Sequence, residues 1–211
     1  LYSSAASDVY KRQDYLMITH FDRDHAGGAA QIIQDFDVKA LLRPEYMKES
    51  DESAACMAAA EDRGVKVIII TSQTDIQLGS TKLVIHPADK VYENDASNNS
   101  SLVTEVFHGN NSLLFTGDIE KERIADIKYE LNDAGYDFLK VPHHGKYEKI
   151  LPEFFSLVGA QSAVITSSEK NPEDQETVQA LVDAGTMNYM LTRNGEITLE
   201  SDGRELSFTQ K

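Results

Sequence analysis

The chain has 211 residues, of which 41% are apolar, and 35 acidic and 20 basic side chains give it a formal charge of −15. This length and apolar content suffice for one domain with a hydrophobic core, and no apolar run approaches the roughly 20 residues that span a bilayer. Cys56 stands alone, which excludes an internal disulfide framework, and the strong negative charge disfavours extensive binding to polyanions.

Residues 1–13 differ in character from the rest of the chain. They are polar and aperiodic, and they lack the apolar core of a signal peptide. Their ending, SDVYKRQ, resembles translated sequencing-adapter sequence. We therefore expect a non-native or disordered tail over 1–13 and a single domain over 14–211, with the genuine sequence beginning near residue 14.

The stretch 14–30, DYLMITHFDRDHAGGAA, begins as an apolar strand and then turns abruptly polar. His20, Asp22, Asp24 and His25 follow the strand, and a glycine pair and a helical pattern come next. Imidazole and carboxylate groups bind zinc, and manganese also accepts them. In a tight loop such residues converge on one point or on two neighbouring points, which predicts a metal site. The alternative is a polar loop in which Asp24 caps the helix.

Beyond this stretch, strand and helix patterns alternate along the chain. We expect strands over 38–43, 65–70, 81–86, 101–107, 112–116, 138–141 and 162–166, and helices over 53–63, 120–132, 152–158 and 173–184. A polar loop is expected over 90–100 and a meander over 188–208. The alternation predicts helices that cover mixed sheets, without a linker that divides the domain.

Two later strands also end in residues that can bind metal. Asp118 follows a glycine after strand 112–116, and His143 and His144 precede a glycine after strand 138–141. A Gly-Asp pair by itself is also an ordinary turn or helix cap. The remaining histidines, His86 and His108, are expected to be structural or exposed.

The motif His20-x-Asp22-x-Asp24-His25-x-Gly-Gly resembles the metal motif of the metallo-β-lactamase fold. Its aspartate at the second position resembles the variant found in the hydrolase domain of the ComEC-type competence family. The resemblance implies an α/β (α+β) fold, a four-layer αβ/βα sandwich that here lacks its N-terminal strands. The metal ligands that it implies are His20, Asp22, Asp24, His25, Asp118 and His143. Asp118 would lie between two ions, Asp24 would also act in catalysis by accepting a proton, and His144 would face the substrate.

The chain departs from the family in the loop 167–175, which has no histidine where the family has a Gly-His-Pro segment. Glu173 or Asp174 replaces that ligand, or the second site is weak or empty, or both acids simply begin the next helix. The segment 98–103 resembles an Asn-x-Ser-Leu-Val segment of the family, which would orient a ligand or bind substrate; it is also an ordinary turn.

The resemblance implies a metal-dependent hydrolase with one or two divalent ions, zinc or manganese, that cleaves a phosphoester in DNA or in a smaller substrate. Lys140, Lys146 and Lys149 would form a small basic lip beside the site, or would simply be solvated. The alternative is a catalytically impaired binding or structural module that retains the fold. A redox enzyme on the same fold lacks a visible flavin partner domain here.

Overall fold

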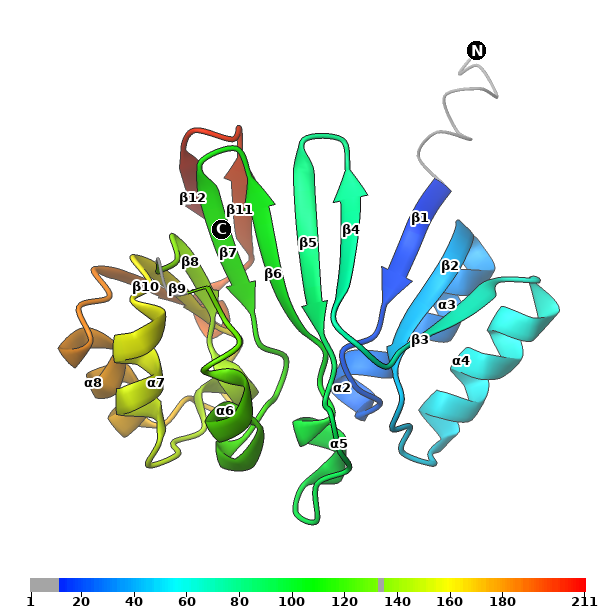
Figure 1. Ribbon diagram of the computed structural model, residues 1–211, viewed down its shortest axis with the longest axis horizontal. Coiled ribbons are helices and arrows are strands. Elements are labelled where there is room, and N and C mark those ends of the chain that lie inside the picture. Colours follow the sequence, from blue (N-terminus) through cyan, green and yellow to red (C-terminus); the bar gives the residue numbers. More distant parts are fainter. Residues whose placement is uncertain (1–11, 133–134) are drawn as a thin grey trace.

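Two sheets face one another in the computed structural model, which describes residues 12–132 and 135–211 (Figure 1). The smaller sheet is parallel, in the order β1 (Arg12–Met17), β2 (Asp37–Pro44) and β3 (Lys66–Ile70). Helices α2 (Arg23–Ala26), α3 (Ala29–Asp35) and α4 (Asp51–Asp62) belong to the same half of the molecule. A buried cluster that includes Ile33, Leu41 and Ala60 joins α3 and α4 to this sheet.

The larger sheet has seven strands in the order β10-β9-β8-β7-β6-β5-β4. Its strands are β4 (Thr74–Leu78), β5 (Thr81–His86), β6 (Val103–His108), β7 (Asn111–Phe115), β8 (Phe138–Lys140), β9 (Ser162–Ile165) and β10 (Asn188–Leu191). Neighbours from β4 to β7 pair antiparallel, and neighbours from β7 to β10 pair parallel. The carboxyl ends of β7, β8 and β9 therefore lie at one edge of the sheet.

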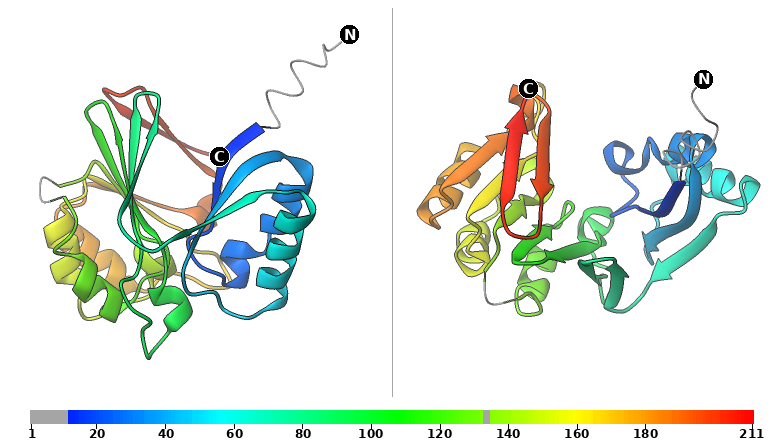
Figure 2. Two further views of the ribbon diagram at one scale, coloured as in Figure 1. Left: turned by 45° about the vertical axis from the view of Figure 1, so that its right-hand side comes forward. Right: turned by 90° about the horizontal axis from the view of Figure 1, so that it is seen from above.

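Helices α6 (Lys121–Ile127), α7 (Leu151–Val158) and α8 (Gln175–Asp183) pack on the outer face of the larger sheet. The apolar stripe of α7 is fully buried, and its Phe154 and Phe155 join Leu114 and Leu139 of the sheet in the largest core cluster. A third cluster, with Leu42 and Ile85, fills the space between the sheets. The layers are thus helix, sheet, sheet and helix, as Figure 2 shows, which confirms the predicted sandwich.

The remaining elements are short. Helix α5 (Ala96–Asn99) and the 3-10 turns η1 (Pro142–Gly145) and η2 (Thr192–Asn194) lie in connections, and the hairpin of β11 (Ile197–Ser201) and β12 (Leu206–Gln210) packs on the larger sheet. Among the described residues, no helix is long and apolar enough to cross a membrane.

Several expected elements differ in the structure. The predicted meander was wrong because β10 pairs parallel with β9, so only β11 and β12 form a hairpin. Strand β4 was missed because its polar, half-exposed sequence TDIQL carries little apolar signal. The expected loop over 90–100 contains α5, and the helix expected to reach 132 ends at Ile127.

Candidate metal centre

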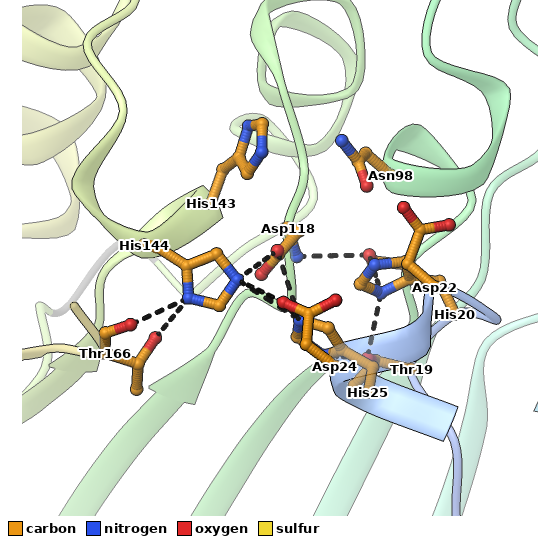
Figure 3. A network of polar contacts seen from close by, with 12 residues as sticks. Thr19, His20, Asp22, Asp24, His25, Asn98, Asp118, His143, His144 and Thr166 are labelled. Carbon is orange, nitrogen blue, oxygen red and sulfur yellow. Dashed lines mark hydrogen bonds and ion pairs between the residues drawn. The ribbon is translucent and has the colours of Figure 1, made fainter. Parts of the chain in front are cut away.

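Four potential ligands from three separated parts of the chain meet at one edge of the two sheets (Figure 3). Asp24 and His25 lie on α2, Asp118 follows β7, and His144 lies in the turn η1 after β8. One ligand atom from each lies within 4.8 Å of those of the other three. This is the only such group of three or more acidic, histidine or cysteine side chains within residues 12–132 and 135–211.

Asp118 lies at the centre of this group and is almost fully buried. Its Oδ2 is 2.8 Å from His144 Nε2 and 3.1 Å from His25 Nε2, while its Oδ1 accepts a hydrogen bond of 3.0 Å from Lys140 Nζ. Burial by itself opposes ionisation, but the hydrogen bonds from the two imidazoles and the charge of Lys140 outweigh it and hold the pKa well below its usual range. Asp118 therefore places a permanent negative charge at the centre of the group.

His144 is oriented from behind by Thr166 at the end of β9. Its Nδ1 lies 2.8 Å from the carbonyl oxygen of Thr166, and since a carbonyl only accepts, Nδ1 carries the proton. Nε2 then faces Asp118 and also Asp24, whose Oδ2 is 3.0 Å away. The hydrogen bond to Asp118 raises the pKa of His144, so a metal ion at Nε2 competes with a proton for this atom.

His20 is completely buried beside this group, with its ring centroid 4.1 Å from that of His25. Its Nδ1 lies 3.1 Å from Ser101 Oγ, whereas its Nε2 is buried with no partner among the described residues. Burial, together with the nearby His25, lowers the pKa of His20 to about 4, so the ring is neutral at pH 7. An unpaired buried nitrogen costs about 1–3 kcal/mol, a cost that coordination to a cation would offset.

Imidazole and carboxylate atoms that converge around the buried Asp118, together with an unpaired imidazole nitrogen next to them, form a donor set suited to a divalent metal ion. The residues present therefore fit the divalent metal ion that the motif predicts. Five of the site residues expected from the sequence lie together here: His20, Asp24, His25, Asp118 and His144.

Asp22 lies outside the group of four and has other partners. Its Oδ1 accepts hydrogen bonds of 2.5 Å from Ser97 Oγ and 3.0 Å from Lys48 Nζ. These bonds outweigh the effect of burial and lower the pKa of Asp22. In this geometry Asp22 connects the loop before α2 to α5 and to the loop before α4.

The two adjacent histidines of η1 diverge. Figure 3 shows His144 turned into the group, whereas the ring of His143 points away from it. His143 Nδ1 lies 3.0 Å from Glu120 Oε1, and burial lowers the pKa of this histidine. The sequence predicted His143 as the ligand and His144 as a residue that faces the substrate. In the structure the ring of His144 lies in the group of four, and that of His143 lies outside it. Which ring binds an ion stays a prediction.

Neither acid of the loop before α8 reaches the group. Glu173 is buried, and its Oε1 lies 3.0 Å from Arg193. Asp174 accepts a hydrogen bond of 2.8 Å from the backbone N–H of Tyr147, and its own N–H donates to the carbonyl of Gly145. Both acids therefore support the η1 turn from behind. Of the expected basic lip, Lys140 contacts Asp118, while Lys146 and Lys149 are exposed.

Ser101 belongs to the segment 98–103, for which the sequence predicted a role in orienting a ligand or binding substrate. Its hydroxyl accepts a hydrogen bond from the backbone N–H of Asp118 at 3.1 Å and also contacts His20. Gly117 makes this approach possible, since a Cβ at that position would lie 2.7 Å from Ser101 Cβ. The Gly-Asp pair at the end of a strand was the available signal, but it did not identify the partner.

The sequence of residues 11–165 matches the family model described as the metallo-beta-lactamase superfamily. The chain belongs to the metallo-beta-lactamase superfamily. It is 30% identical over 162 residues to ComE operon protein 3 of Bacillus subtilis, covering 76% of this chain and 21% of that protein. It is 29% identical over 157 residues to Recombination protein 2 of Haemophilus influenzae, covering 74% of this chain and 18% of the relative. These identities confirm the resemblance to the competence family. The chain spans about a fifth of the length of these curated relatives.

Solved structures agree on the metallo-beta-lactamase fold. Igni18, a metallo hydrolase from Ignicoccus hospitalis, superposes with a TM-score of 0.56 at 15% identity, covering 94% of this chain and 80% of that one. CmlA, a diiron β-hydroxylase from Streptomyces venezuelae, gives a TM-score of 0.55 at 15% identity, with coverage of 86% and 44%. The chain therefore belongs to a superfamily of metal-dependent hydrolases, and it carries a candidate divalent-metal site where three strands end.

Proposed function

We propose that this domain is a metal-dependent hydrolase that cleaves a phosphoester, in DNA or in a smaller molecule. The observation that carries the proposal is the convergence of Asp24, His25, Asp118 and His144 within 4.8 Å, with the unpaired nitrogen of His20 beside them. These five residues would hold one or two divalent ions, zinc or manganese, with Asp118 at the centre. A divalent ion held there supplies Lewis acidity and brings the pKa of a bound water toward neutrality.

The residues of the chain then have distinct tasks. Asp118 provides the central negative charge, and Thr166 fixes the tautomer of His144 so that Nε2 is the ligating atom. Asp24 is the most exposed member of the group, and its carboxylate can accept a proton from the attacking water. Lys140, which is bound to Asp118 Oδ1, keeps a positive charge next to the position where an anionic substrate would bind.

The phosphoester assignment rests on the kinship with competence-type proteins, and the net charge of −15 favours a short substrate over a long polyanion. Hydrolysis of bis-p-nitrophenyl phosphate in the presence of Mn²⁺ or Zn²⁺ tests the class of bond. A dinucleotide and a long single-stranded DNA, compared at the same phosphate concentration, then test substrate length.

The expected result is turnover that requires the ion and is lost in Asp118→Asn. Binding of metal without turnover of any of these substrates would contradict the proposal. It would instead favour a binding module, the alternative suggested by the absence of a histidine in the loop 167–175.

A further inference from the structure

A second polar group lies next to the metal centre and is separate from it. Glu120, which follows Asp118 by two positions, lies 3.0 Å from His143 Nδ1 through its Oε1. The same oxygen accepts a hydrogen bond of 2.9 Å from the side-chain amide of Asn98. The Glu120 side chain is only 12% exposed, whereas that of His143 is 28% exposed. The acid is therefore buried behind an imidazole that reaches solvent.

The acid is fixed in place before any ligand arrives. Besides the bond from Asn98 to its carboxylate, its backbone N–H donates a hydrogen bond of 2.9 Å to Asn99 Oδ1. Both asparagines belong to α5, so a helical turn from one part of the chain holds Glu120 at its side chain and at its backbone. A carboxylate held in this way can restrict the orientation of an imidazole, which a freely rotating one cannot.

The backbone supports the same conclusion. His143 and His144 have φ values of 42° and 53°, in the left-handed region that non-glycine residues seldom adopt. Such a conformation is strained for a non-glycine residue and persists only where surrounding contacts enforce it. Here the conformation sends two adjacent imidazoles in different directions, with ring centroids 6.1 Å apart (Figure 3). One ring enters the metal centre and the other pairs with Glu120.

We propose that His143 is a substrate-contacting residue of this site and that Glu120 is the residue that positions it. Since Nδ1 faces Glu120, the ring nitrogen without a partner among the described residues is Nε2. The ring centroid lies 6.1 Å from that of His144, so a phosphoryl group bound at the metal centre could accept a hydrogen bond from Nε2. The inference rests on the proposed function only in assigning the phosphoester as the ligand.

The test uses variants that respect the left-handed backbone. Asparagine and glycine tolerate this conformation, so His143→Asn and His143→Gly remove the imidazole without adding strain. Glu120→Gln keeps the shape of the acid but removes its charge, and His144→Ala provides the comparison in which a proposed metal ligand is lost. Each protein is loaded with Mn²⁺, and its metal content is measured by elemental analysis.

Metal content should remain at the wild-type level in the His143 and Glu120 variants and fall in His144→Ala. Binding of inorganic phosphate to the Mn²⁺-loaded proteins, measured by calorimetry, should weaken about fivefold in both His143 variants, as for the loss of one hydrogen bond. Loss of metal in both His143 variants would overturn the inference, because it would make His143 a ligand. Unchanged phosphate affinity in both would overturn it as well.

The positioning role of Glu120 has its own measurement. In metal-free protein at pH 8, ring proton spectra should show a downfield, slowly exchanging Nδ1 proton on His143. This signal should move upfield in Glu120→Gln, because an amide oxygen is a weaker acceptor than a carboxylate. A signal at the same position in the variant would contradict the role. Phosphate binding and these spectra do not depend on turnover. A wild-type protein that binds phosphate through His143 but does not hydrolyse bis-p-nitrophenyl phosphate would therefore reject the proposed function and leave this inference standing.

Discussion

Two histidine–carboxylate groups lie on the larger sheet, one around Glu105 and one around Asp118. They differ in how the oxygens of the buried carboxylate are used. In one, the two oxygens of Glu105 are taken by protein groups, Oε1 by His86 at 2.8 Å and Oε2 by the hydroxyl of Tyr136. In the other, a single oxygen of Asp118 faces two imidazoles, and Asp24 approaches one of them. In the first group both carboxylate oxygens are used, although His86 Nδ1 is buried without a hydrogen bond among the described residues, whereas the second gathers four ligand atoms around one point. A buried histidine next to an acid therefore indicates a metal site only where several ligand atoms share that point.

The largest effect expected from this difference is on metal binding. Asp118→Asn should lower metal affinity by more than about 100-fold, the upper end of the loss seen when only an outer partner is disturbed. Glu105→Gln should leave metal affinity unchanged and lower the free energy of unfolding by about 1–3 kcal/mol. Calorimetric titration with Zn²⁺ and denaturant unfolding measure the two quantities. Equal loss of metal in both variants would remove the distinction.

The two groups should also respond to pH in different ranges. His20 has a pKa of about 4 in the folded chain against about 6.5 when unfolded, so the unfolded state binds more protons between these values. Stability of the metal-free protein should therefore fall as the pH drops from 6.5 to 4, by up to about 3 kcal/mol. His20→Asn should lack this component.

Glu105 should affect the pH dependence of stability in a lower range than His20. Burial opposes its ionisation, but hydrogen bonds from His86 and Tyr136 prevail and lower its pKa. Its contribution is present above the unfolded pKa of about 4.3 and is lost only as the pH falls further. Unfolding at a series of pH values, with a chelator present, measures both components. An unchanged slope between pH 4 and 6.5 in His20→Asn would contradict the assignment.

Removal of metal should affect only the group around Asp118. At an ion concentration of 100 times Kd, binding raises the free energy of unfolding by about 2.7 kcal/mol, which corresponds to roughly 5–10 °C in Tm for a domain of this size. A chelator should reverse this shift in the wild type and in Glu105→Gln, and should have no effect on Asp118→Asn. Thermal unfolding followed by circular dichroism provides the measurement.

The smallest effect concerns two glycines of the motifs. A Cβ on Gly145, which has φ +79°, would lie 2.7 Å from Ile165 Cγ2 and 2.8 Å from Glu173 Cβ. Gly145→Ala should therefore destabilise the protein by about 1–3 kcal/mol and weaken metal binding through His144. Gly28 has φ −89° and open space among the described residues, so Gly28→Ala should be neutral or stabilising by up to about 1 kcal/mol. Similar behaviour of the two variants would argue against a tightly supported η1 turn.

Local signals in the sequence predicted helices that cover mixed sheets and three strand ends that carry possible metal ligands, whereas the four-layer arrangement was implied by the resemblance to the metallo-β-lactamase fold. Apolar runs that end in His20 to His25, in Asp118 and in His143-His144 mark the ends of β1, β7 and β8. Parallel pairing then brings the ends of β7 and β8 to one edge, a property that follows from the strand order and not from any contact between side chains.

Hydrogen bonds between residues that lie far apart along the chain could not be predicted from these local signals. Asp22 has the spacing of a ligand, but the hydrogen bond that its Oδ1 accepts from Ser97, 75 positions away, cannot be read from the motif. Nor does the sequence tell which of two adjacent histidines enters the site, because that depends on backbone angles in the left-handed region. The polar edge strand β4 and the short α5 escaped detection because they bury little apolar surface.

The ligands come from both halves of the chain: Asp24 and His25 from the part attached to the smaller sheet, and Asp118 and His144 from the part attached to the larger one. An ion held by all four would tie these halves together. If the polypeptide were cleaved within the exposed loop at residues 71–73, between β3 and β4, Zn²⁺ or Mn²⁺ should strengthen reassembly of the two pieces. In that form the domain would report metal concentration through association of its own fragments.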